Sequence, residues 1–184
     1  MSAAEGAPAA APAAGGLADA SIARILQGCA AQDNLHDLDP QPSATEWEAF
    51  VAHARASPAA ECASALGSCY YCGVGVAEDG VEAARLFRQA ADQGDAHAQC
   101  KLGWCNEIGE GVAGDMEEAF RLYRLAADQG HVRAIFNLGM CFEKGEGVAQ
   151  DPQEAVRHFR LAAEQGHADA KRVLQRIERR PEAR

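Results

Sequence analysis

The chain repeats itself at a spacing of 36 residues. Residues 91–126 and 127–162 align without a gap and are identical at 21 of 36 positions, and residues 58–90 carry a third, related copy. The copies share a Leu-Gly pair, a Gly-x-Gly-Val segment, an aspartate and an alanine in the same order. A period of this length is typical of stacked arrays, in which neighbouring units share one continuous core. The repeat therefore predicts an elongated array rather than a compact globule.

Each copy is expected to contain two helices joined by a glycine turn. In the second copy, the helices are predicted from about Asp95 to Ile108 and from about Met116 to Gln129, with the turn at residues 109–111. Alanine is abundant and threonine, valine and isoleucine are scarce, which favours helices over strands. A glycine recurs after each second helix, where it can adopt the left-handed conformation that ends a helix. The sequence therefore predicts an all-α fold.

Several repeat positions have structural explanations. Glycine recurs in the middle of each first helix, at Gly67, Gly103 and Gly139, where it costs about 0.5–1 kcal/mol relative to alanine. We therefore expect another helix backbone to pass close to these glycines. The leucine and ring positions are expected to fill the core, and the recurring aspartates to cap the second helices. The predicted core residues are Leu66, Leu86, Phe87, Leu102, Leu122, Tyr123, Leu138 and Phe159, and the predicted caps are Asp79, Asp115 and Asp151.

Charged side chains recur on the second helices. In each copy a glutamate is followed three residues later by an arginine, starting with Glu82 and Arg85. Pairs at this spacing stabilise a helix by about 0.2–0.5 kcal/mol. We interpret them as a solvated outer face, and the alternative is an arginine stripe for an acidic partner. His131 and His167 begin two of the first helices and are expected to be exposed.

The sequence predicts four segments. Residues 1–16, rich in Ala, Pro and Gly, are expected to form a disordered arm. Residues 17–57 are interpreted as N-terminal capping helices of a degenerate repeat: a weak helix over about 17–27, a loop over 34–42, and a helix that opens with the capping box Ser43-Ala44-Thr45-Glu46 and ends near Ala56. The repeat array follows over 58–178, divided at about 58–90, 91–126, 127–162 and a partial copy 163–178, and residues 179–184 form a basic tail.

The repeated motif resembles that of a known family. The chain carries the pattern A-x-x-x-L-G-x-x-x-x-x-G-x-G-V-x-x-D-x-x-x-A with a 36-residue period, which is similar to the Sel-1-like repeat, a helical-pair solenoid related to tetratricopeptide repeats. The resemblance covers about residues 58–177. It implies a right-handed α-α superhelix of about three helix-turn-helix repeats with capping helices at both ends. Family members typically act as adaptors or scaffolds, so the resemblance implies binding to another protein.

Composition excludes some classes of function. The formal charge of −10 argues against nucleic acid as a partner, because nucleic-acid binders present a basic surface. No apolar stretch approaches the roughly 18 residues that span a bilayer. The N-terminus lacks the basic start and leucine-rich middle of a secretory signal. We therefore expect a cytoplasmic protein with no membrane span.

The cysteines raise the alternative of a redox or metal function. Cys69 and Cys72 form a C-x-x-C near the end of a predicted helix, where the helix dipole disfavours a thiolate. No second C-x-x-C completes a zinc site. The repeated Cys69, Cys105 and Cys141 are better explained as small buried side chains, and the odd total of seven cysteines suits a reducing compartment. We expect no metal site and no cofactor.

The family resemblance suggests a further alternative. A cysteine-rich branch in gastric bacteria joins the two helices of each unit by a disulfide and has been linked to penicillin binding, whereas this chain has no cysteine in its predicted second helices. It also has no serine or threonine after Ser68, so the later repeats offer no hydroxyl nucleophile. We therefore predict that the protein is not an enzyme and has no catalytic residue. Penicillin-binding or thiol-redox activity and a self-associating structural module stay as alternatives.

The first helix of each unit is expected to line the inner curve, as in tetratricopeptide-like arrays. The inner positions vary between units while the structural positions repeat, as expected where a ligand sets the residue. The predicted partner-binding residues are Tyr71, His97, Trp104, Glu107, Arg133, Phe136, Met140 and Glu143.

We expect the concave face to hold a peptide or helix of a partner protein, with Trp104 and Phe136 as anchors, because tryptophan is enriched in interaction hot spots. The alternative is that these apolar side chains simply pack between units. The sequence does not identify the partner. We expect a monomer, with end-to-end self-association as the alternative.

Overall fold

The computed structural model describes residues 15–31 and 41–179. This part of the chain forms nine helices and no strand, so the all-α prediction is confirmed. The helices are α1 (Gly15–Ala31), α2 (Ala44–Ala56), α3 (Ala60–Cys72), α4 (Gly80–Ala91), α5 (Ala96–Ile108), α6 (Met116–Asp128), α7 (Val132–Lys144), α8 (Pro152–Glu164) and α9 (Ala168–Glu178).

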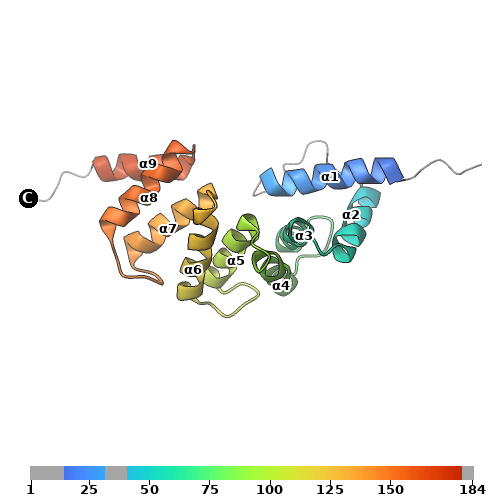
Figure 1. Cartoon of the computed structure of the whole chain (residues 1–184), viewed down its shortest axis with the longest axis horizontal. Helices are drawn as coiled ribbons and strands as arrows, with labels where there is room; N and C mark the ends of the chain where they lie inside the picture. Colours follow the sequence, from blue (N-terminus) through green and yellow to red (C-terminus); the bar gives the residue numbers. More distant parts are fainter. Residues whose placement is uncertain (1–14, 32–40, 180–184) are drawn as a thin grey trace, which may run out of the picture.

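The helices stack as consecutive pairs along an arc (Figure 1). The pairs α3–α4, α5–α6 and α7–α8 are the three complete repeats, and each second helix also packs against the first helix of the next repeat. At one end α1 packs on α2 and α3, and at the other α9 packs on α8. The arc opens between α1 and α9. The predicted helical-repeat solenoid is therefore confirmed.

The predicted helix ends agree closely with the observed ones in the repeats. Asp95 caps α5, and the Ser43 capping box is formed, since the Ser43 hydroxyl accepts from the backbone N–H of Glu46 and the Glu46 carboxylate accepts from the backbone N–H of Ser43. The first helix differs: α1 begins at Gly15, inside the predicted arm, and extends beyond the predicted end at residue 27. The rest of the predicted arm, most of the predicted 34–42 loop and residues 180–184 of the tail lie outside the described residues.

The aspartate at the start of each second helix acts as predicted. One carboxylate oxygen of Asp79, Asp115 and Asp151 accepts two backbone N–H groups of the first turn at 2.9–3.1 Å. These bonds satisfy N–H groups that have no partner within the helix. Each second helix therefore starts at the same point of the period.

A layer of rings and glycines joins the two helices of each repeat. A Cβ added to Gly103 would lie 2.8 Å from the ring of Tyr123, and one added to Gly139 would lie 2.6 Å from the ring of Phe159. The backbone oxygen of Ala119 lies at 3.3 Å from the same point at Gly103. The prediction of a close helix backbone is therefore incomplete: the backbone is near, but the atoms that require glycine belong to a buried ring on the paired helix.

Neighbouring repeats meet at a second glycine position. A Cβ added to Gly111 would collide with the backbone oxygen of Gly80, and one added to Gly147 would collide with that of Met116. The same position in the first repeat, Gly75, faces the ring of Trp47, at 2.6 Å from the added Cβ. The start of one second helix therefore sits against the turn of the next repeat, and at the N-terminal junction an aromatic ring takes that place.

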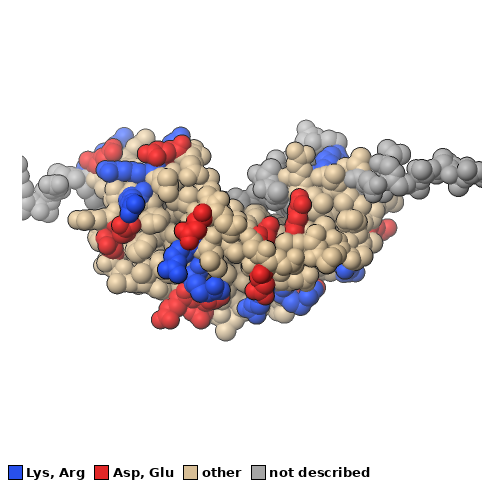
Figure 2. Space-filling view, in the orientation of Figure 1, with Lys and Arg blue, Asp and Glu red and all other residues tan. Residues whose placement is uncertain are grey.

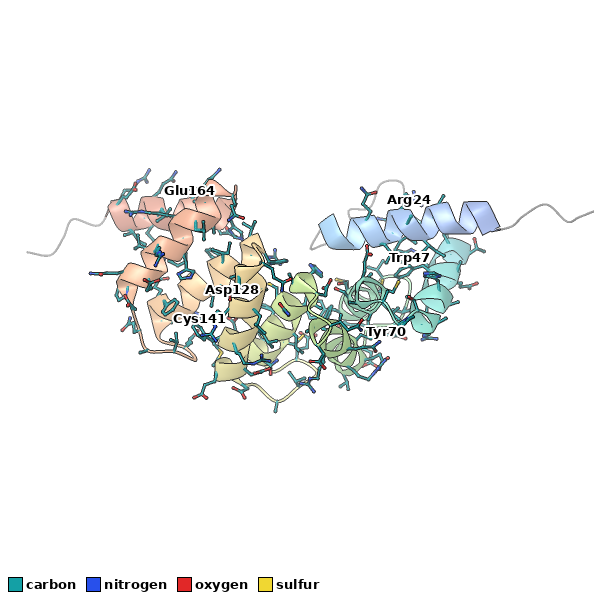
Figure 3. All side chains as sticks on the ribbon, in the orientation of Figure 1. Arg24, Trp47, Tyr70, Asp128, Cys141 and Glu164 are labelled. Carbon is teal, nitrogen blue, oxygen red and sulfur yellow. The ribbon has the colours of Figure 1, made fainter. Side chains whose placement is uncertain are left out.

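The N-terminal helices α1 and α2 are joined by a polar network. The Glu46 carboxylate accepts from the Ser21 hydroxyl at 2.6 Å and lies 3.3 Å from the Arg24 guanidinium. The hydrogen bond from Ser21, with those from Ser43, lowers the pKa of Glu46 to about 2. Arg24 on α1 and Trp47 on α2 are labelled in Figure 3. This pair of helices is held by contacts that the complete repeats do not use.

The outer face carries the predicted ion pairs. Glu82 and Arg85, like Glu118 and Arg121, approach to 2.7 Å, with the arginine side chains exposed and the glutamate side chains half-buried. Figure 2 shows acidic and basic side chains next to one another along the lower edge of the molecule, over α4 and α6. This arrangement agrees with a solvated outer face.

Candidate binding groove

A groove of about 350 Å³ runs across the first helices of the repeats. It is lined by residues of α3, α5 and α7 and by the start of α9. Figure 2 shows the molecule hollowed between its two ends. The lining residues are Tyr71, Cys100, Lys101, Trp104, Arg133, Phe136, Asn137, His167 and Asp169.

Trp104 and Tyr71 form an aromatic platform at one end of the groove. The Trp104 indole N–H donates to the Tyr71 hydroxyl at 3.0 Å, and Trp104 is 40% exposed. The Lys101 ammonium lies 5.8 Å from the centre of the Tyr71 ring, within the range of a cation–π contact. Burial raises the pKa of Tyr71. A large apolar side chain is therefore held in one orientation while a large part of its surface faces solvent.

Phe136 lies farther along the groove and has two roles. Its ring stacks on His167 with 4.5 Å between centroids and an angle of 15° between the rings, and it lies 5.6 Å from the ring of Phe159. His167 is in turn fixed, because its Nδ1 accepts from the backbone N–H of Ala170 at 3.3 Å. Phe136 thus packs between repeats, as the alternative interpretation expects, and also lines the groove.

The charged lining residues include two cations and one anion. Lys101 comes from α5 and Arg133 from α7, and Asp169 lies in the first turn of α9. The Asp169 carboxylate pairs with Arg172, and this hydrogen bond lowers the pKa of Asp169. The anion therefore has a positive partner within its own helix.

The repeats match a known family model. The model of the Sel1 repeat matches residues 60–95, 96–131 and 132–167 in direct succession, which covers most of the chain and all three helix pairs. The chain belongs to the Sel1 repeat family. Sel1 repeats are in general structural scaffolds that bind other proteins. A comparison with curated proteins finds no match.

Solved Sel1 structures share the fold. A Sel1 repeat protein from Oxalobacter formigenes is 32% identical, with a TM-score of 0.64 over 71% of this chain and 51% of its own. A protective antigen of uropathogenic Escherichia coli strains with an SLR fold is 28% identical, with a TM-score of 0.68 over 83% of this chain and 32% of its own. The chain thus spans about half of one relative and a third of the other.

A third structure is more distant in sequence. Cysteine-rich protein B of Helicobacter pylori is 20% identical, with a TM-score of 0.57 over 72% of this chain and 97% of its own. At this identity the similarity establishes the fold alone.

The Sel1 array brings four of the eight predicted binding residues to the groove and places four elsewhere. Tyr71, Trp104, Arg133 and Phe136 line it. The Glu107 carboxylate instead accepts from the buried Tyr123 hydroxyl at 2.7 Å, and Glu143 lies 3.6 Å from Arg176. The other two residues outside the lining are His97, whose Nε2 lies 3.5 Å from the Ser68 hydroxyl and whose ring lies 5.9 Å from that of His131, and the half-buried Met140.

Several lining residues of the Sel1 groove were not among the predicted binding residues. Lys101 and Asn137 share one repeat position, directly after the inner position of Cys100 and Phe136. A predicted binding face that is one residue wider on the same helices would include both Lys101 and Asn137. His167 and Asp169 come from the next unit, and no residue pattern within one repeat indicates that they reach the groove.

The histidines that begin α7 and α9 are not exposed as predicted. His131 and His167 are half-buried, and each Nδ1 accepts from a backbone N–H at 3.3 Å. They occupy the repeat position of Asp95, which caps α5 in the same way at 2.6 Å. A helix N-terminus needs an acceptor there, and a neutral imidazole supplies one.

The repeated cysteines lie in the core of the Sel1 array. Cys69, Cys105 and Cys141 are buried, and burial raises the pKa of Cys105 to about 11 and that of Cys141 to about 12. A thiol in this state is a poor nucleophile. No disulfide joins the cysteines of the described part of the chain.

Two classes of feature are missing from residues 15–31 and 41–179. These residues contain no group of three or more His, Cys, Asp or Glu side chains placed to hold a metal ion. None of their helices combines the length and apolar character needed to cross a bilayer.

Proposed function

We propose that this chain is an interaction scaffold whose groove across α3, α5 and α7 binds a peptide or helix of a partner protein. Trp104 carries this proposal. Its indole is oriented by Tyr71 and yet 40% exposed. Its repeat position is filled by Ser68, Met140 and Arg176 in the other units, so the stack does not need tryptophan there.

The dimensions of the groove fit a short segment of a partner. Its volume of about 350 Å³ lies near the lower end of the range for binding pockets, about 300–1,000 Å³. The aromatic surface of Trp104 and Phe136 suits an apolar side chain, and the polar groups of Arg133 and Asn137 suit a peptide backbone or a polar neighbour. An oriented aromatic side chain also loses little conformational entropy on binding, which favours a hot spot.

A photo-cross-linking experiment tests the groove as the binding surface. A photo-reactive residue in place of Asn137, which lines the groove, is expected to capture a partner in the native cell. The same residue in place of Arg121, on the outer face, serves as the matched position and is expected not to capture it.

A substitution then links the cross-link to Trp104. Trp104→Ala is expected to abolish the product formed from position 137 while the circular dichroism spectrum stays unchanged. Ile108→Ala is the control, because Ile108 is an apolar residue of the same helix, is 47% exposed and does not line the groove. Equal products from both positions, or a product that survives Trp104→Ala, would reject the proposed site.

We further propose a non-catalytic role in a reducing compartment such as the cytoplasm. The buried Cys105 and Cys141, with raised pKa values, support packing rather than thiol chemistry. Assays for nitrocefin hydrolysis and for thiol-dependent reduction of insulin are expected to give no activity above buffer. Turnover in either assay would contradict this part of the proposal.

A further inference from the structure

We propose that α1 is a displaceable occupant of a second docking surface, the inner face of α3, and that an amphipathic helix of a partner protein binds there when α1 leaves. The partner helix carries aliphatic side chains three residues apart, as α1 does at Ile22 and Ile25, and a hydrogen-bond donor beside them for Glu46. This surface adjoins the groove but does not include Trp104, so the inference goes beyond the proposed function and does not rest on it.

The helix α1 lies on the inner side of the array. It packs on both α2 and α3. Figure 1 shows α1 crossing α3 on the side opposite to α4, where it faces α9 across the opening of the arc. In α5 and α7 the same side lines the groove. In the first repeat, α1 therefore covers the face that lines the groove in the other two.

The inner face of α3 is suited to contact with a helix, because it is small at three positions where α5 and α7 carry mostly larger side chains. In α3 these positions hold the buried residues Ser64, Ala65 and Ser68. The corresponding residues are Cys100, Lys101 and Trp104 in α5 and Phe136, Asn137 and Met140 in α7. Small side chains at a contact allow two helix axes to approach closely. The Ser68 hydroxyl also donates to the backbone oxygen of Ser64 at 3.1 Å, so it needs no partner from a covering helix.

The face of α1 that covers α3 is aliphatic. Among residues 20–28 of α1, whose side chains the structure describes, Ile22 and Ile25 are buried and Leu26 is half-buried. Residues three and four apart lie on one face of a helix. These side chains pack in the same apolar cluster as Ala65 and Leu66 of α3. The contact is therefore an amphipathic helix laid on a shallow apolar surface, which is a recurring mode of recognition between proteins.

A polar contact beside the aliphatic face fixes the position of α1 along this surface. The Glu46 carboxylate on α2 accepts from the Ser21 hydroxyl at 2.6 Å and lies 3.3 Å from the Arg24 guanidinium. Ser21 directly precedes Ile22, and Arg24 directly precedes Ile25, so each buried isoleucine has a donor next to it in the sequence. A partner helix with the same order of donors and aliphatic residues reproduces both kinds of contact.

The helix α1 is attached to the array differently from the repeats. It lies outside the matched Sel1 units, which begin at residue 60, and it contains three glycines among its 17 residues, which lowers its helix propensity. Its ion pair with Glu46 joins partly solvated side chains, and such pairs contribute little to stability. The repeats instead share a layer of buried rings. Elements attached in this way open locally at a lower free-energy cost than global unfolding, so α1 can leave while the repeats stay folded.

A peptide added in trans tests whether the surface on α3 accepts a separate helix. The probe is a labelled peptide of residues 15–31 that carries Cys29→Ser, and it is titrated against the full chain and its variants. A chain with both Ile22→Asp and Ile25→Asp releases α1 and is expected to bind the probe about tenfold or more tightly than the unchanged chain. In the unchanged chain, the tethered α1 occupies the same surface at a high effective concentration and reduces the fraction that can bind.

Two controls accompany this titration. A chain with Ala23→Asp and Gln27→Asp receives the same charges at exposed positions of α1, and it is expected to behave like the unchanged chain. A probe that carries Ile25→Asp is expected not to bind any variant. Ser21→Ala is a milder variant of the chain, and it is expected to bind the probe with intermediate affinity, because Glu46 stays available for the serine of the probe. Circular dichroism checks that the repeats of each variant are folded.

Hydrogen exchange of the unchanged chain measures the release of α1 without any substitution. The backbone amides of α1 are expected to exchange about tenfold or more faster than those of α6, because α1 opens locally while α6 is protected until the repeats unfold. Exchange of both helices at the same rate would show that α1 leaves only on global unfolding, and it would overturn the proposal.

The outcomes of the titration separate this inference from the proposed function. Equal affinity of the probe for the unchanged and the released chain, or no binding by any folded variant, would overturn the proposal and leave the groove as a candidate site. Trp104→Ala in the released chain is expected to leave probe binding unchanged. Loss of probe binding in that variant would place the probe in the groove rather than on α3 and would also overturn the proposal.

Discussion

Gly103 and Trp104 are neighbours on α5, yet they lie on different faces of that helix. Gly103 faces the ring of Tyr123 on the paired helix, whereas Trp104 lines the groove. The position of Gly103 holds glycine in all three complete repeats, because a buried ring of the paired helix fills the space beside it. The position of Trp104 holds a different residue in every unit. The same helix thus carries one face that maintains the stack and another face whose residues can vary without disturbing it.

The largest expected effect lies in the ring layer. Tyr123→Ala is expected to destabilise the fold by about 3–5 kcal/mol, because it removes a fully buried ring and leaves a cavity between α5 and α6. Tyr123→Phe is the matched variant and is expected to cost about 1.5–3 kcal/mol, the net value of a hydrogen bond to a charged group such as the Glu107 carboxylate. Urea unfolding followed by circular dichroism measures both. Equal losses in the two variants would show that the hydroxyl, rather than the ring, supports the layer.

The glycine of the same layer is expected to show a smaller effect. Gly139→Ala is expected to destabilise by about 1–2 kcal/mol, since overpacking against the Phe159 ring outweighs the better helix propensity of alanine. Gly114→Ala is the control, because an added Cβ there meets its nearest atom at 3.5 Å, an ordinary contact. The same unfolding experiment compares them. A stabilised Gly139→Ala variant would break the proposed link between ring and glycine.

A position that varies between repeats can also stabilise the stack. His131→Asp is expected to stabilise the protein by about 0.5–1 kcal/mol, because a carboxylate caps a helix and interacts with its dipole better than a neutral imidazole does. Asp95→His, the reverse exchange at the same repeat position, is expected to destabilise by a similar amount. Thermal unfolding measures both changes, and two shifts of the same sign would contradict this account of the cap.

The smallest effect is expected at the N-terminal pair, α1 and α2, which is joined by the polar network around Glu46. The pKa of Glu46 is lowered to about 2, so its stabilising contribution is present above the ordinary value of 4.5 and is lost as the pH falls between these values. In a Trp104→Phe background, the fluorescence of Trp47 is expected to report the loosening of α1 from α2 over this range. Glu46→Gln is expected to remove that transition. A transition that persists unchanged in Glu46→Gln would assign it to another carboxylate.

Most of the fold could be predicted from the repeat alone. The 36-residue period, the glycine turns and the aspartate caps placed the ends of α5 and α6 within about a residue, because each signal occurs three times. The N-terminal helix was predicted too short, since its sequence has no copy elsewhere in the chain. The role of Gly103 was only partly predicted, because helix propensity indicates that glycine is unfavourable but not which neighbour requires it.

The site was less predictable than the fold. The spacing of inner positions indicates which helix face a residue occupies. Trp104 and Phe136, which it assigns to the inner face, line the groove. It does not indicate which side chains find partners inside the protein. Glu107 is held by the buried Tyr123 hydroxyl, and this contact depends on a tyrosine where the other repeats have phenylalanine. A contact of this kind, between a core residue and a residue expected at the surface, cannot be predicted from the residue pattern of a single repeat.

The contact of each turn glycine with the preceding second helix has a consequence for how such proteins diversify. Gly111 packs against the backbone of Gly80 in the same way as Gly147 packs against that of Met116. The two junctions between repeats therefore have equivalent packing. A duplicated 36-residue repeat is therefore expected to pack against the repeats on both of its sides without further changes. A longer protein made in this way gains new inner-face residues on which selection can act, and its added repeat uses the same packing as the existing ones.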